Sequence, residues 1–70
     1  MSRYLIVIEK TKSNYSAYSP DLHGCIATGK TRSETMHNMR EAIEMHVNGL
    51  LEDKLPVPKP VASADYVAIA

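Results

Sequence analysis

The chain has 70 residues, of which 44% are hydrophobic, a mass of 7.8 kDa and a formal net charge of +0 at pH 7. We expect a single domain over residues 1–70, which buries only about 60% of the surface that its unfolded chain exposes. The single cysteine, Cys25, excludes an internal disulfide. A neutral chain has no general electrostatic attraction to nucleic acid. Self-association or a partner protein is therefore the expected source of added stability.

The sequence also indicates the cellular compartment in which we expect the protein. It has no run of about 18 apolar residues, so we expect no membrane span. The apolar run near the N-terminus ends at Glu9-Lys10 and lacks the small-residue cleavage site of a signal peptide. A lone unpaired cysteine fits a reducing compartment, so we expect a cytoplasmic protein.

Three short strands are predicted in the first half. Residues 4–8 are β-branched and aromatic without alternation, which favours a central strand covered on both faces. Residues 9–14 are polar and predict a hairpin. Residues 15–19 predict a second strand, with Tyr15 and Ala17 on one face and Ser16 and Tyr18 on the other. Residues 20–24 break the ladder, and residues 25–28 predict a third strand that stops at Gly29.

The helix has the clearest local signals. Thr31 and Glu34 have the spacing of a capping box, with Ser33 as an alternative cap. Apolar side chains then recur every three to four residues, at Met36, Met39, Ile43, Val47, Leu50 and Leu51. The polar face carries His37, Glu41, Glu44, Asn48 and Glu52. The helix should end by Lys54, because the Pro-Val-Pro-Lys-Pro segment at 56–60 favours an extended polyproline-like chain.

Residues 66–69, Tyr-Val-Ala-Ile, predict a last short strand. The resulting order is β-β-β-α-β. This order predicts an α+β domain, with an antiparallel three-stranded sheet, one helix packed on one face, and a returning edge strand.

The histidines and the cysteine do not form an evident reactive site. His37 and His46 should lie on opposite sides of the helix and cannot share a metal ion, and His23 alone adds too few ligands. Cys25 would need a positioned base to become a nucleophile, and His23 is the candidate two residues away. A buried core thiol is the stronger interpretation, because cysteine is among the most buried residue types.

The remaining polar residues also form no evident reactive site. The carboxylates include no convincing acid–base pair. Gly24, Gly29 and Lys30-Thr31 superficially resemble the end of a phosphate-binding loop, but their spacing is wrong. We therefore predict no catalytic residue, no bound cofactor and no metal ion.

A second stripe on the helix predicts a contact surface. Asn38, Ala42, Met45 and Gly49 lie on a common face, apart from the main apolar arc. Small residues let another backbone approach, and methionine adapts to irregular surfaces. Gly49 costs about 1 kcal/mol in a helix interior relative to alanine, which suggests a packing reason for it. Local fraying and a singly exposed methionine are the alternatives to self-association through these four residues.

The loop and the helix also form a combined pattern. Its residues are Tyr15-x-Ala17-x-x-Pro20-Asp21-Leu22-x-Gly24-Cys25, Gly29-x-Thr31, Glu34, Asn38 and Glu41-Ala42-Ile43. Together with Leu55-Pro56-Val57-Pro58, this pattern resembles the HicB antitoxin family over essentially all of residues 4–69. It departs at His23, Lys30 and Thr35, where the family often has proline, an acidic residue and alanine, and these departures concern partner specificity more than fold.

The resemblance implies a pared-down ribonuclease H-like fold without nuclease activity. It also implies a type II toxin–antitoxin system, in which a HicA-like toxin that cleaves mRNA is neutralised when the antitoxin covers its active site. Family members assemble as homo-oligomers, either dimers or tetramers. Many carry a C-terminal DNA-binding domain, but Ala70 directly follows the last predicted strand, so we expect no direct DNA binding by this chain.

The loop after the second strand is the predicted partner-binding site. Asp21 beside Leu22, which we expect to be exposed, would present a charge and an apolar anchor together. Pro20 and His23 complete this predicted recognition loop, and an ordinary tight turn is the alternative.

Three hypotheses for function follow from the sequence. The leading one is a HicB-like antitoxin that acts by binding a toxin. The second is a solitary structural or regulatory protein that self-associates through the stripe around Met45 and Gly49. The third is a residual metal-dependent hydrolase, for which the strands offer only Glu9 and Asp65 as ligands.

Overall fold

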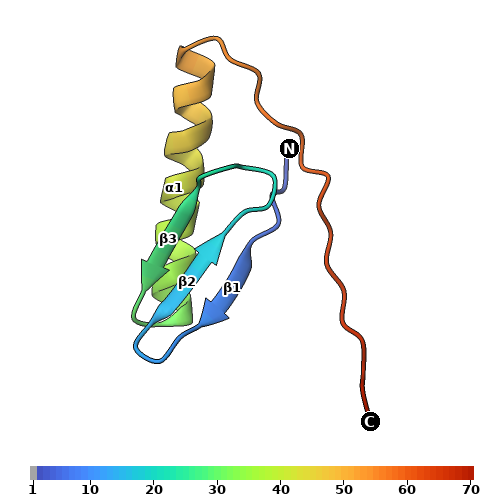
Figure 1. Cartoon of the computed structure of the whole chain (residues 1–70). Coiled ribbons are helices and arrows are strands. Elements are labelled where there is room, and N and C mark those ends of the chain that lie inside the picture. Colours follow the sequence, from blue (N-terminus) through green and yellow to red (C-terminus); the bar gives the residue numbers. More distant parts are fainter. Residues whose placement is uncertain (1) are drawn as a thin grey trace.

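A computed structural model describes residues 2–70 and contains three strands and one helix. The elements are β1 (Val7–Lys10), β2 (Tyr15–Tyr18), β3 (Ile26–Gly29) and α1 (Arg32–Glu52). The strands form one antiparallel sheet in the order β1-β2-β3, and α1 lies across one face of it (Figure 1). The predicted α+β class, with three antiparallel strands followed by one helix, is confirmed.

The register of the strands separates the two faces of the sheet. Ala17 pairs with Ile8 on one side and Ala27 on the other, and it is only 2% exposed because this row faces α1. The neighbouring row joins Val7, Tyr18 and Ile26 on the opposite face, where Tyr18 is 42% and Ile26 69% exposed. The predicted alternation along the second strand is therefore confirmed.

The first strand differs from its prediction. It spans Val7–Lys10 instead of residues 4–8, and it lies at an edge of the sheet, half-buried or exposed rather than covered on both faces. The cause is the length of β2, whose pairing with β1 ends at the Val7–Tyr18 pair just before Ser19-Pro20. Residues 4–6 consequently have no partner strand.

The third strand begins one residue later than predicted. Cys25 belongs to the preceding turn, because its backbone N–H donates to the Leu22 carbonyl at 3.1 Å. The Leu22 N–H donates in turn to the Ser19 carbonyl at 3.2 Å. Gly24 adopts a φ of +80°, the left-handed conformation that favours glycine.

The predicted helix and its cap are confirmed. The Thr31 hydroxyl accepts a hydrogen bond from the Glu34 N–H at 3.0 Å. The Glu34 carboxylate accepts from the Lys30 N–H at 3.3 Å, one residue earlier than in the expected box. The helix ends at Glu52, and Lys54 follows in the left-handed conformation with a φ of 56°.

The core is small. Within residues 2–70, four hydrophobic residues are buried, namely Ala17, Leu22, Cys25 and Met39. Partly buried side chains surround them, at Tyr4, Ile6, Ile8, Ala27, Ala42, Ile43 and Val47. Leu51, assigned to the buried arc of the helix by its spacing, is 60% exposed because it lies beyond the end of the sheet.

The chain after α1 is extended and forms no strand within residues 2–70, so the predicted strand at 66–69 is absent from the single chain. It turns back from the end of α1, crosses to the side of β1 and then stands clear of the body (Figure 1). Tyr66, Val67 and Ile69 are 98%, 82% and 85% exposed. These side chains pack on no other part of the chain, because the segment stands clear of the body.

Candidate protein-binding surfaces

The side chains that could have carried chemistry lie apart. Cys25 is 5% exposed, and burial raises the pKa of its thiol, which makes it a poor nucleophile. On α1, the His37 Nε2 atom lies 2.6 Å from the Glu41 Oε1 atom, in an exposed pair one helical turn apart. Among residues 2–70, no three His, Cys, Asp or Glu side chains are placed to hold a metal ion. No helix in this range is long and apolar enough to cross a membrane.

The predicted recognition loop is only partly available to a partner. Leu22 is 0% exposed, so the expectation of an exposed apolar anchor is wrong. The turn that begins at Ser19 directs this side chain into the core, where it packs with Met39. Pro20 and His23 are exposed, and their role in binding a partner stays a prediction.

Asp21 has an internal role that the sequence did not indicate. Its Oδ2 atom accepts hydrogen bonds from the backbone N–H groups of Val61 at 3.2 Å and Ala62 at 3.1 Å. Near the other end of the same segment, the Tyr4 hydroxyl donates to the Pro58 carbonyl at 2.7 Å. We call these hydrogen bonds the tail clamp, because they fix the extended chain where it leaves the body. They join residues 40 to 54 positions apart, a separation that leaves no local sequence signal.

The outer face of α1 carries a shallow acidic depression. Its open volume is about 470 Å³, and it is lined by Glu41, Glu44, Met45, Asn48, Gly49 and Glu52. Gly49 borders this open space, since a Cβ there would meet no atom within 4 Å. Met45 is 76% exposed beside it. The result is an adaptable apolar side chain surrounded by three carboxylates.

The helical stripe predicted for self-association is divided by the structure. The Asn38 Nδ2 atom donates to the Thr28 carbonyl at 2.8 Å and so holds α1 against β3. Ala42 packs against the chain's own core. Met45 and Gly49 are left facing outward at the acidic depression, so half of the stripe is available for contact with another chain.

The sheet face opposite α1 is a further open surface. The row of Val7, Tyr18 and Ile26 crosses all three strands there. Aligned apolar and aromatic side chains of this kind stabilise a sheet through cross-strand contacts. The alternation along the second strand predicted that Tyr18 lies opposite Ala17, but the first strand was expected to be covered on both faces.

Comparison with known proteins identifies relatives. The family model described as HicB_like antitoxin of bacterial toxin-antitoxin system matches residues 4–69. A 14.9 kDa protein of the rep-hol intergenic region of Haemophilus phage HP1 is 42% identical over 91% of this chain, which spans only 48% of that protein. A UPF0150 protein of Helicobacter pylori is 43% identical over 70% of this chain and 68% of its own length.

A solved structure extends the similarity to three dimensions. A chain in the HicA3 and HicB3 toxin-antitoxin complex matches with a TM-score of 0.72 and 33% identity, over 86% of this chain and 70% of that one. The family model covers nearly the whole sequence, and the three strands and one helix agree with this neighbour. The chain belongs to the HicB-like family of bacterial antitoxins.

Proposed function

We propose that this chain is the antitoxin of a type II HicA–HicB-like system, and that it neutralises a small mRNA-cleaving toxin by covering the toxin's active site. The observation that carries this proposal is the similarity to a chain of a HicA3–HicB3 complex over 86% of the sequence. The proposed action is binding without catalysis, and it takes place in the cytoplasm, where mRNA is translated.

The acidic depression on α1 is the surface best suited to such a toxin. A protein that binds RNA presents cationic groups to phosphates. Glu41, Glu44 and Glu52 supply the opposite charge around the depression, although the chain as a whole is neutral. Complementary charge mainly increases the association rate, and an apolar side chain at the centre adds affinity when it is desolvated. Met45 would be that central side chain.

Self-association through the same depression is the alternative role for it. A symmetric dimer brings the same patch of two copies together. Glu41, Glu44 and Glu52 would then face the same carboxylates of the second copy, and like charges repel at short distance. This surface therefore favours a basic partner over a second copy.

The test is co-expression of this chain with the small basic protein encoded beside it. We expect the two proteins to co-purify and the chain to restore growth that the toxin alone arrests. The antitoxin proposal fails if wild-type chain neither binds the toxin nor restores growth.

Charge reversal tests the surface separately. Glu44→Lys should slow association with the toxin, most strongly at low salt. Glu9→Lys makes the same charge change at an exposed position of β1 and is the matched control. If both variants bind the toxin equally well, the depression is not the contact surface, even if the wild-type chain proves to be an antitoxin.

A further inference from the structure

The edge of the sheet at β1 is open. β2 pairs with one side of β1, and no segment of residues 2–70 pairs with the other side. Two adjoining depressions, of about 580 and 460 Å³, lie along this edge and share Leu5, Ile6 and Ile8 in their walls. An unpaired edge of this kind presents free N–H and C=O groups to which another strand can bind.

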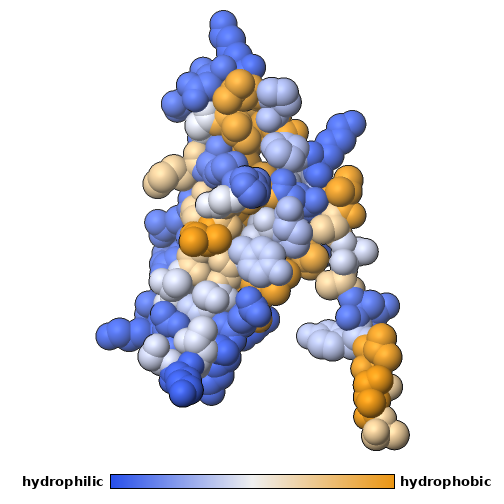
Figure 2. Space-filling view, viewed as in Figure 1, coloured by the Kyte–Doolittle hydropathy of each residue, from blue (hydrophilic) through white to orange (hydrophobic). Residues whose placement is uncertain are grey.

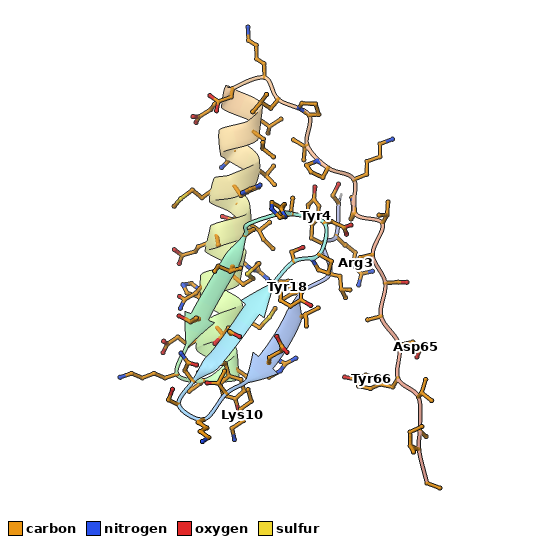
Figure 3. All side chains as sticks on the ribbon, viewed as in Figure 1. Arg3, Tyr4, Lys10, Tyr18, Asp65 and Tyr66 are labelled. Atoms are coloured by element: carbon orange, nitrogen blue, oxygen red, sulfur yellow. The ribbon has the colours of Figure 1, made fainter. Side chains whose placement is uncertain are left out.

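The opposite wall of these depressions is the C-terminal tail, which we define as residues 63–70. Ser63 and Ala64 line the first depression, and Ala64, Asp65 and Tyr66 line the second. The tail runs beside β1 and points the same way (Figure 1). Figure 3 shows the Tyr66 side chain projecting from the tail toward the sheet. Because Tyr66 is 98% exposed, its ring reaches no neighbour and the space between tail and sheet is open.

The tail itself has the character of an unpaired strand. Tyr66, Val67 and Ile69 are residue types enriched in strands, and all three are more than 80% exposed. Figure 2 shows this end of the chain as an apolar group that stands clear of the body. The tail clamp, at Tyr4 and Asp21, fixes the chain just before the tail begins.

We propose that the groove between β1 and the tail receives the tail of a second copy, so that two copies exchange C-terminal strands. A two-fold axis perpendicular to the sheet reverses the direction of every strand in the second copy. Because β1 and the tail of one copy run the same way, the partner's tail would run antiparallel to both of them. Across the joined sheet, the strand order would be β1 of one copy, the partner's tail, the tail of the first copy and the partner's β1. Both free edges and both apolar tails are covered by this one exchange.

Charge favours the tail of a second copy as the occupant. The groove walls carry three cationic residues, Arg3, Lys10 and Arg32, against one carboxylate, that of Asp65. The tail has one charged side chain, Asp65, so a tail entering the groove brings a carboxylate to these cations. The chain's own tail, if it moved onto β1, would pair in the parallel sense, which is slightly less stable per residue.

Sedimentation equilibrium of the full chain, with hydrogen exchange at residues 66–69, tests the exchange. We expect a dimer whose tail amides lose protection when the protein is diluted. Val67→Pro should raise the dissociation constant of the dimer roughly tenfold or more, because proline cannot donate to a ladder. Lys59→Pro is the matched control, since Lys59 is exposed between two prolines, and it should leave the dimer intact.

Three outcomes would overturn the strand exchange. The first is a wild-type chain that stays monomeric at every concentration tested. The second is tail protection that does not depend on concentration, which would place the chain's own tail on β1. The third is a dimer that survives Val67→Pro but dissociates with Gly49→Glu, which would assign the interface to the outer face of α1. These measurements use this chain alone, so none of them decides whether it binds a toxin.

Discussion

Substitution of Gly29 tests the packing between β3 and α1, because β3 and α1 approach closely at this glycine. Gly29 is buried at the end of β3, where a Cβ would lie 2.6 Å from the Thr35 Oγ1 atom and 2.8 Å from the Thr35 backbone nitrogen. Neither atom can move easily. The Thr35 hydroxyl donates to the Thr31 carbonyl at 2.8 Å, and the Thr35 N–H donates to the same carbonyl at 3.0 Å. Gly29→Ala must therefore displace the first turn of α1.

The expected cost is large for so small a protein. Overpacking of this kind destabilises by about 1–3 kcal/mol, and we expect the upper half of that range because backbone atoms are among those contacted. A 70-residue domain has a total stability of about 4–10 kcal/mol. A loss of about 2 kcal/mol should lower the Tm by roughly 8–16 °C.

The other glycines serve as matched controls for Gly29→Ala. Gly24→Ala meets no atom within 4 Å but forces alanine to a φ of +80°, at a cost of about 1–2 kcal/mol. Gly49→Ala lies in open space within α1 and should stabilise by about 1 kcal/mol. Urea unfolding followed by circular dichroism, at one protein concentration, gives all three values. The argument fails if Gly29→Ala unfolds at the same urea concentration as the wild type.

Substitutions at four further sites test the remaining contacts, with Asp21 followed by hydrogen exchange and the others by the same unfolding assay. Thr31→Ala should cost about 1 kcal/mol through loss of the cap, whereas Thr31→Ser keeps the hydroxyl. Leu22→Ala should cost about 2–5 kcal/mol, against nearly none for exposed His23→Ala. Asp21→Ala should speed hydrogen exchange at Val61 and Ala62, and unchanged rates there would argue against the tail clamp. Because burial raises the folded pKa of Cys25, the unfolded chain loses the thiol proton first, so stability should fall as pH rises above about 8.5. Cys25→Ala should remove that dependence.

The features predicted correctly from the sequence are those with local causes. The helix and its cap follow from residues three and four positions apart, such as Thr31 and Glu34, which interact within one turn. Ala17 and Tyr18 lie on opposite faces of the sheet because side chains alternate along a strand with a period of two residues. Family membership was likewise indicated by residues 15–43, whose combined pattern agrees with the matched family model.

The features missed depend on parts of the chain that are distant in sequence. The first strand was expected to be covered on both faces, but its partners are decided by where β2 ends. Leu22 was expected to be an exposed anchor in the loop after the second strand, yet the turn at Ser19 and the left-handed Gly24 direct it inward. Asp21 was interpreted as a partner contact, but it binds backbone 40 residues away. A local pattern holds no information on these long-range contacts.

The balance between the core and the open surfaces explains why binding should govern the stability of this protein. Among residues 2–70, the buried hydrophobic residues are Ala17, Leu22, Cys25 and Met39, while others such as Met45 and Val67 face outward. A partner that binds only the folded chain stabilises it by about 2.7 kcal/mol when present at 100 times its Kd. Strand exchange would make the Tm rise with the concentration of the chain itself, whereas toxin binding would make it rise with added toxin. Because the tail and the acidic depression lie on different elements, Val67→Pro should weaken only the dependence of the Tm on chain concentration, and Glu44→Lys only its dependence on added toxin.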